Sequence, residues 1–216
     1  MEIVRNIFDV LLHLNQHLQS WTAEYGVWVY GILFLIVFCE TGLVVTPFLP
    51  GDSLLFAVGA LAGGGTLSAP LAGGLIFLAA VLGDAVNYFI GSRLGEVACV
   101  RWPRLIRREY LDRTHSFFER YGGKTIIIAR FVPIVRTFAP FVAGAGRMTY
   151  RRFMAYNVSG AALWVVTIVG AGFWFGQMEW VKKNFSAVVL AIIVISILPA
   201  VFEVWREWRR ARQPAK

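Results

Sequence analysis

Four charged residues lie inside apolar stretches of this 216-residue sequence, where charge is costly. Glu40 and Asp52 belong to one stretch, and Arg130 and Arg136 belong to another. On insertion scales a charged side chain at the centre of a membrane helix costs about 2.5–3.5 kcal/mol, so four of them require partners or water. These four residues are therefore the first candidates for a functional site.

The two arginines suit an anionic ligand that carries a phosphate group. A guanidinium is a planar fork of donors that matches phosphate in a bidentate manner. Helix N-termini near the same point would add further donors. The sequence therefore predicts that Arg130 and Arg136 bind a phosphate.

The acidic residues allow two roles. Glu40 and Asp52 could exchange protons as the arginines bind and release phosphate, which would couple transport to a proton gradient, or they could neutralise the arginines in the empty site. Asp84 is a candidate third acid near the same cavity, or a helix cap beside Gly83.

A purely structural alternative is that the charges only pair with one another and hold their segments together. Buried ion pairs stabilise a fold no better than well-packed hydrophobic residues, which favours a functional reason for their presence.

Helix-breaking residues interrupt both charged stretches. Pro47, Pro50 and Gly51 lie in the first, and Pro133 and Pro140 in the second. Proline removes a backbone donor, and non-helical backbone at membrane depth is tolerated only where protein or a watery cavity covers it. Each stretch is therefore predicted to be a re-entrant, broken-helix hairpin.

The composition indicates that these hairpins lie in a membrane. Hydrophobic residues make up 57% of the chain and charged residues 16%, with a mean hydropathy of +0.62. A soluble domain has about 45–50% apolar and about 25% charged residues. The net charge of +8 comes from blocks that border apolar runs, so it indicates membrane topology rather than a nucleic-acid partner.

We predict an all-α polytopic membrane protein with a single domain over residues 1–216. Its predicted parts are an interfacial amphipathic helix (1–24), a helix plus the first re-entrant segment (27–63), a span (69–95), a cytoplasmic basic amphipathic segment (101–124), the second re-entrant segment (125–146), two spans (155–177 and 185–202) and a cytoplasmic basic tail (203–216).

The basic blocks predict the orientation. By the positive-inside rule, the tail and both flanks of 125–146 are cytoplasmic, which makes that segment re-entrant and places both termini in the cytoplasm. Lys182 and Lys183 fall on the outside and oppose the rule. Two opposed hairpins with charges of opposite sign are typical of transporters built from inverted repeats.

Other residue types indicate no catalytic, metal or cofactor site. His13, His17 and His115 lack metal-ligand spacing, and no nucleophile elbow, zinc-protease or phosphate-loop motif occurs, so an enzyme is not predicted. Asn157 is expected to cap a helix or bond between helices. The tryptophans of the last third of the chain are predicted to lie mostly in the membrane-interface belt: Trp164, Trp174, Trp180, Trp205 and Trp208.

Three long segments of the sequence resemble the DedA family of bacterial inner-membrane proteins. They run from Phe38 to Ser53, from Gly83 to Tyr88 and from Tyr121 to Gly144, and the resemblance covers essentially the whole chain. It implies two opposed re-entrant hairpins, a fold shared with eukaryotic lipid scramblases, and a location in the bacterial inner membrane.

The resemblance also implies an activity. Members of the family are linked to moving lipid phosphates across the bilayer, notably undecaprenyl phosphate, and acids matching Glu40 and Asp52 and arginines matching Arg130 and Arg136 are regarded as essential and tied to the proton-motive force. The implied partners are a membrane lipid, either undecaprenyl phosphate or a phospholipid, and protons.

The sequence thus predicts a proton-linked flippase of undecaprenyl phosphate. Its alternatives are a phosphatidylethanolamine scramblase, a proton-coupled antiporter of small ions or drugs, and a chaperone of membrane-protein insertion. The lipid carried, the strictness of proton coupling, the acid that carries the proton and the oligomeric state, a homo-oligomer included, stay open at this point.

Overall fold

The computed structural model describes residues 20, 24–43, 51–101, 123–195 and 198. The predicted amphipathic helix at 1–24, the basic segment at 101–124 and the tail at 203–216 lie wholly or mostly outside these residues. The labelled elements of the described part are all helices: α3 (Trp28–Gly42), α4 (Gly51–Gly63), α5 (Ala69–Arg101), α7 (Lys124–Ala129), α8 (Pro133–Ala145), α9 (Tyr150–Phe175) and α10 (Glu179–Lys183).

Two helices are long and apolar enough to cross a membrane. They cover Ala69–Leu94 of α5 and Tyr150–Phe175, each 26 residues long. At 1.5 Å per residue such a helix is about 39 Å long, which exceeds the roughly 30 Å of a hydrocarbon core. A shorter apolar helix follows at Phe185–Ile195. The predicted all-helical class is therefore confirmed for the described residues.

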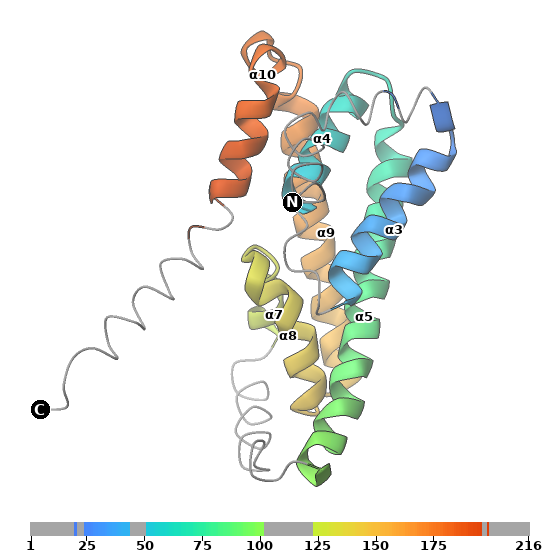
Figure 1. The fold of residues 1–216 in the computed structure, drawn as a ribbon, viewed down its shortest axis with the longest axis vertical. Coiled ribbons are helices and arrows are strands. Elements are labelled where there is room, and N and C mark those ends of the chain that lie inside the picture. Colours follow the sequence, from blue (N-terminus) through green and yellow to red (C-terminus); the bar gives the residue numbers. More distant parts are fainter. Residues whose placement is uncertain (1–19, 21–23, 44–50, 102–122, 196–197, 199–216) are drawn as a thin grey trace, which may run out of the picture.

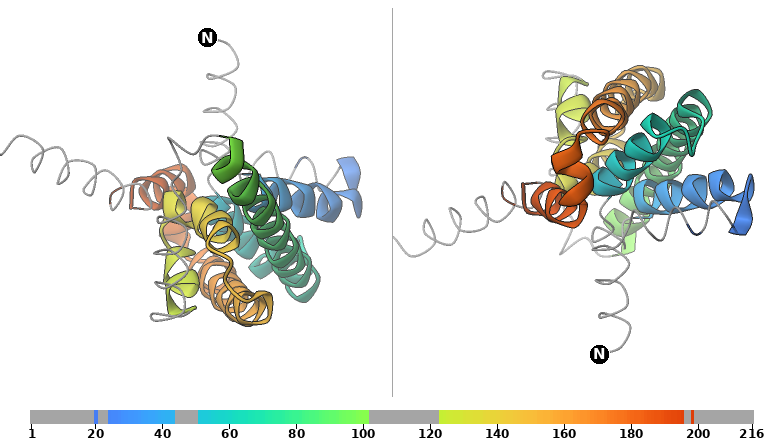
Figure 2. Two further views of the ribbon diagram at one scale, coloured as in Figure 1. Left: turned by 90° about the horizontal axis from the view of Figure 1, so that it is seen from below. Right: turned by 90° about the horizontal axis from the view of Figure 1, so that it is seen from above.

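The shorter helices pack against these two long ones. α4 makes its most extensive contacts with α9, while α3 and α8 both pack on α5. In Figure 1, α3 and α4 lie mainly in the upper half of the molecule and α7 and α8 in the lower half. The end views of Figure 2 show α5 between α3 on one side and α9 on the other.

Both charged stretches are interrupted, and each break separates two helices. α3 ends at Gly42, and α4 begins at Gly51. Pro47 and Pro50 lie between them, outside the described residues. Residues 130–132 separate α7 from α8, and Val132 is extended (φ −116°, ψ 106°). α8 then begins at Pro133, where the missing N–H would have had no helical partner.

Pro140 does not break its helix, contrary to the prediction. α8 continues through it to Ala145. The physical reason is packing: a proline removes a single helical hydrogen bond, and α8 is held along its length against α5.

Glycines set the closest approaches of α5 to its neighbours. A Cβ at Gly91 would collide with the backbone of Phe141, and one at Gly144 would collide with the carbonyl of Tyr88. Two turns earlier in α5, Gly83 lies against Gly42 of α3, with a Cβ on Gly42 at 3.3 Å from the Gly83 Cα. Small residues allow such backbone contact between membrane helices.

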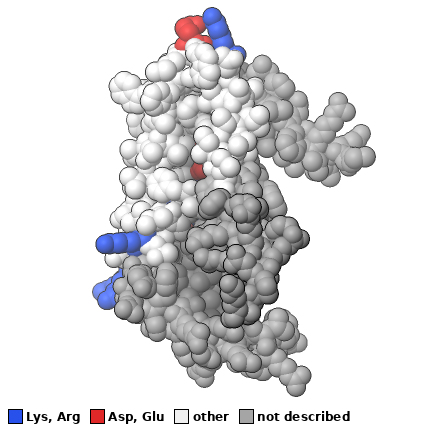
Figure 3. Space-filling model, turned by 90° about the vertical axis from the view of Figure 1, so that its left-hand side faces the viewer, with Lys and Arg blue, Asp and Glu red and all other residues white. Residues whose placement is uncertain are grey.

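On the face that Figure 3 shows, charged side chains of the described residues are separated by an uncharged band. Blue and red atoms lie at the top and blue atoms lie lower down at the left, with a mainly white area between them. Large apolar side chains such as Trp28, Val166 and Trp174 are exposed. A small red area at mid-height is the exception in this band.

We expect Gly91→Ala to lower the stability of the protein, because the added methyl group pushes α8 away from α5. Overpacking of this kind costs about 1–3 kcal/mol. The check is the thermal unfolding midpoint of the purified protein in detergent. Gly74→Ala in the same helix is the matched control, since nothing lies within 4 Å of its Cβ position. Equal midpoints for both variants would contradict the close α5–α8 contact.

Candidate functional site

Glu40 joins three helices through a single buried carboxylate. It lies in the last turn of α3 and is only 1% exposed. Its Oε1 accepts hydrogen bonds from Arg136 Nη2 of α8 and from the backbone N–H of Gly51, the latter at 3.3 Å, at the start of α4. A Cβ at Gly51 would collide with this carboxylate, so any larger residue at position 51 would have to displace the Glu40 side chain.

Arg136 binds both acids of the first broken stretch. Besides the bond to Glu40, its Nη1 donates to Asp52 Oδ1 at 3.0 Å. Asp52 lies in the first turn of α4, and its side chain is 13% exposed, against 3% for that of Arg136. One guanidinium therefore ties α8 to both sides of the α3–α4 break.

Arg130 forms a second, separate ion pair. It lies in the break between α7 and α8, and its Nη2 donates to Asp84 of α5 and to Asn157 Oδ1 of α9, the latter at 2.6 Å. Asn157 also donates through Nδ2 to the Val81 carbonyl at 3.0 Å. Each of the two long helices thus contributes one partner to this arginine.

Asp84 is not a helix cap, which corrects one of its two predicted roles. It lies in the interior of α5, which runs from Ala69 to Arg101, and its side chain is 3% exposed. Asn157 does bond between helices, as one of its predicted roles had it.

Trp164 was predicted as a belt residue, and that prediction is wrong. Trp164 is fully buried in the middle of α9, whereas Trp174 and Trp180 are 76% and 67% exposed. Its Nε1–H donates to Asp52 Oδ1 at 2.9 Å. Its ring lies 4.9 Å from Arg136 Cζ. The signal available in the sequence was position, because belt residues lie near helix ends and Trp164 does not.

Asn87 was missed in the sequence. It is fully buried in α5, and its Nδ2 donates to the Thr41 carbonyl at 3.2 Å and to the Thr137 carbonyl at 2.8 Å. It therefore bridges the end of α3 to α8, one turn from Asp84. An amide inside an apolar span was the available signal.

We call Glu40, Asp52, Asp84, Arg130 and Arg136 the charge cluster. With every member ionised it carries two positive and three negative charges. Several buried polar atoms around it have no hydrogen-bond partner among the described residues: Glu40 Oε2, Asp84 Oδ1, Asn87 Oδ1, Arg130 Nη1 and Arg136 Nε. Buried polar groups are usually paired, so this spare capacity indicates a place for water or a polar ligand.

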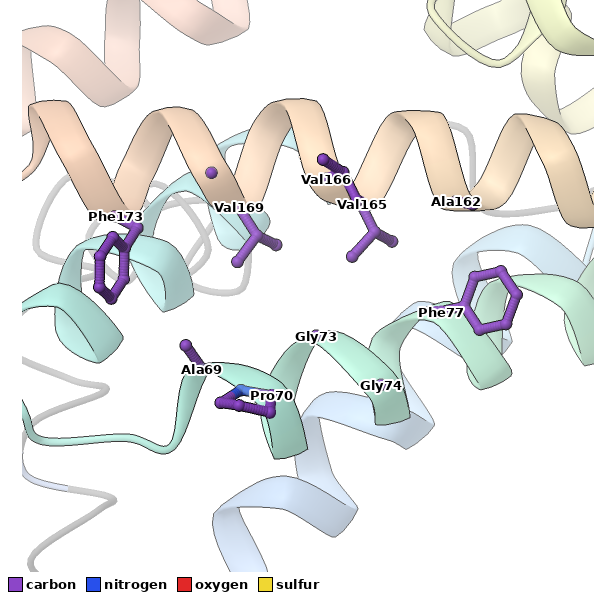
Figure 4. Close-up of a pocket in the computed structure, with 11 residues that line it drawn as sticks. Ala69, Pro70, Gly73, Gly74, Phe77, Ala162, Val165, Val166, Val169 and Phe173 are labelled. Carbon is purple, nitrogen blue, oxygen red and sulfur yellow. The ribbon is translucent and has the colours of Figure 1, made fainter.

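An apolar groove lies apart from the charge cluster. It has a volume of about 550 Å³, runs between α5 and α9, and is lined by apolar residues that include Phe77, Val165 and Phe173. Figure 4 shows these side chains on the two facing helices. The groove can contact hydrocarbon but offers nothing to a phosphate. Within the described part of the chain, no three His, Cys, Asp or Glu side chains are grouped as metal ligands.

Together the apolar spans, the broken helices and the buried charges define a helical membrane protein with a polar site inside its bundle. The sequence matches the VTT domain family over residues 49–174. It is 56% identical to Protein DedA of Escherichia coli, with all of both chains aligned. The chain therefore belongs to the DedA family of VTT-domain membrane proteins.

More distant relatives share the same character. An uncharacterized membrane protein of Mycobacterium tuberculosis is 40% identical over 89% of this chain and 87% of its own. Inner membrane protein YqjA of Escherichia coli is 33% identical over 81% of this chain and 80% of its own. No solved structure matches the chain.

We expect Asp84→Asn to destabilise the protein strongly, because it leaves Arg130 buried without its counter-charge. Removing one partner of a buried ion pair costs about 3–5 kcal/mol. The measurement is unfolding in detergent, and Glu179→Gln, at an exposed acid, is the control. In the double variant with Arg130→Gln the loss should be smaller than the sum of the single losses. Strictly additive losses would contradict the pairing.

Proposed function

We propose that this protein is a flippase that moves undecaprenyl phosphate across the bacterial cytoplasmic membrane for recycling of the carrier lipid, linked to the proton-motive force. The observation that carries the proposal is the pairing of Arg136 with two carboxylates inside an apolar bundle. A guanidinium bound to two carboxylates is already arranged to bind the oxygens of a phosphate.

Binding then proceeds by exchange of anions. A phosphate that approaches Arg136 takes over the donors that Glu40 and Asp52 occupy in the empty site. Asp52 is the more exposed of these two acids, so it lies nearer the surface from which a headgroup would come. Arg130 provides a second cation, with one Nη atom still unpaired.

The charge balance of the site gives protons a role in transport. The charge cluster holds one more carboxylate than guanidinium, and a phosphate would add further negative charge. Uptake of protons by the displaced carboxylates restores the balance in a medium of low dielectric constant, where unpaired charge is costly. A headgroup that crosses with protons is then driven by their gradient.

The lipid tail requires no polar route. The outward faces of the long helices are apolar, so the polyprenyl chain stays in the hydrocarbon while the headgroup passes through the bundle. In this proposal the α3–α4 and α7–α8 pairs are re-entrant hairpins that enter from opposite faces of the membrane, and both termini are cytoplasmic. The protein acts as a transporter rather than an enzyme.

We expect Arg136→Lys to slow undecaprenyl phosphate translocation in proteoliposomes by about 10- to 100-fold, because lysine keeps the charge but loses the bidentate fork. Loss of one charge-assisted hydrogen bond, about 1.5–3 kcal/mol, gives this range. Arg151→Lys, at an exposed arginine of α9, is the matched control.

Wild-type rates for Arg136→Lys would contradict the phosphate role. Equal movement of phosphatidylethanolamine without a gradient would instead identify a scramblase. No lipid movement by the wild-type protein would contradict both lipid functions and favour an ion antiporter.

We expect an imposed pH gradient to accelerate translocation by the wild-type protein. The variants Glu40→Gln, Asp52→Asn and Asp84→Asn then test each acid in turn. If one of them still moves lipid, but at a rate that the pH gradient does not change, the acid replaced in it carries the proton. Glu179→Gln, the control, should respond as the wild type does. If all three cluster variants keep the full response, proton coupling does not run through these acids.

A further inference from the structure

Trp164 differs from the other tryptophans that the structure describes. Trp28, Trp174 and Trp180 are at least 67% exposed, whereas Trp164 is 0% exposed. A buried indole usually finds a partner for its N–H, and here the partner is the charge cluster itself. The exposed tryptophans suit a membrane interface, so Trp164 requires a different explanation.

The indole, the carboxylate of Asp52 and the guanidinium of Arg136 form a closed triangle. Asp52 Oδ1 accepts from Trp164 Nε1 at 2.9 Å and from Arg136 Nη1 at 3.0 Å. The third side is the contact of Arg136 Cζ with the indole ring, 4.9 Å from its centroid. Each group is thus held by the other two.

The contact of Arg136 with the ring does not compete with its contacts to anions. A guanidinium that lies over an aromatic ring is attracted to the ring face, while its N–H donors point outward in its own plane. The ring can therefore keep its hold on Arg136 whether carboxylates or a phosphate occupy those donors.

The same ring also faces the second ion pair. Arg130 Cζ lies 5.8 Å from the centroid of the Trp164 ring. Trp164 is therefore in reach of both arginines, although these come from different ion pairs and bind acids of different helices.

We propose that Trp164 is the positioning residue of this site: its ring face holds Arg136 in place while the anion on Arg136 changes, and its N–H holds the carboxylate of Asp52. This inference rests on the proposed function for the identity of the incoming anion. The triangle itself can be tested without any lipid.

Two substitutions distinguish the contribution of the ring face from that of the N–H. Trp164→Phe keeps an aromatic face and removes the N–H, whereas Trp164→Leu removes both. Trp174→Phe, in the same helix but exposed, is the matched control. All five members of the charge cluster are unchanged in all three variants.

The first measurement is undecaprenyl phosphate transport in proteoliposomes as a function of substrate concentration, which gives KM and kcat separately. We expect Trp164→Leu to raise KM about 10-fold with a smaller change in kcat, because the variant loses the ring face that holds Arg136. Trp164→Phe keeps an aromatic face and should leave KM within about 3-fold of wild type. Trp174→Phe should leave both constants unchanged.

The second measurement is thermal unfolding in detergent without lipid, in a double-mutant cycle of Trp164→Phe with Asp52→Asn. A loss of stability in the double variant smaller than the sum of the single losses supports the triangle, provided that Trp174→Phe with Asp52→Asn is additive. This result holds even if the wild-type protein moves no lipid, an outcome that would overturn the proposed function alone. Additive losses for Trp164→Phe, or an unchanged KM in a folded Trp164→Leu, overturn the positioning role.

Discussion

The structure depends on finding partners for two buried guanidinium groups. Arg136 is 3% exposed in a bundle with an apolar outer surface, so its charge must be matched inside. The match comes from Glu40 and Asp52, which requires α8 to lie beside the α3–α4 break. Glu40 in turn accepts from the Gly51 N–H, which fixes the start of α4. The buried charge of Arg136 is thus connected, through Glu40, to the first residue of α4.

The sequence was sufficient to select the charged residues but not to pair them. Charge in an apolar stretch is rare, so the position of a charged residue in such a stretch is enough to select it. This criterion selected Glu40, Asp52, Asp84, Arg130 and Arg136. The pairs join residues 46, 84 and 96 positions apart. Such pairs depend on which helices pack together, and no local pattern in the sequence carries that information. The all-helical class was predictable because apolar length determines it.

The two wrong predictions share one cause, which is tertiary packing acting against a local tendency. Proline usually ends a helix, yet α8 continues through Pro140 because it is packed along α5. Tryptophan usually lies at the interface because its N–H needs a polar partner, yet Trp164 is buried because Asp52 supplies that partner within the bundle. In both cases a local tendency is overcome by a contact with another helix: the packing of α8 on α5 at Pro140, and the carboxylate of Asp52 at Trp164.

The two arginines are not equivalent, and their surroundings decide which one exchanges its anion in the proposed function. Arg130 is held by Asp84 and Asn157, which belong to the two long helices, and both of these residues are buried. Arg136 is held by residues on either side of the α3–α4 break, one of which has a 13% exposed side chain. In the proposed function, a headgroup would therefore meet Asp52 and Arg136 before it meets Arg130. In the proposed cycle Arg136 changes partners, while Arg130 keeps the two long helices together around it.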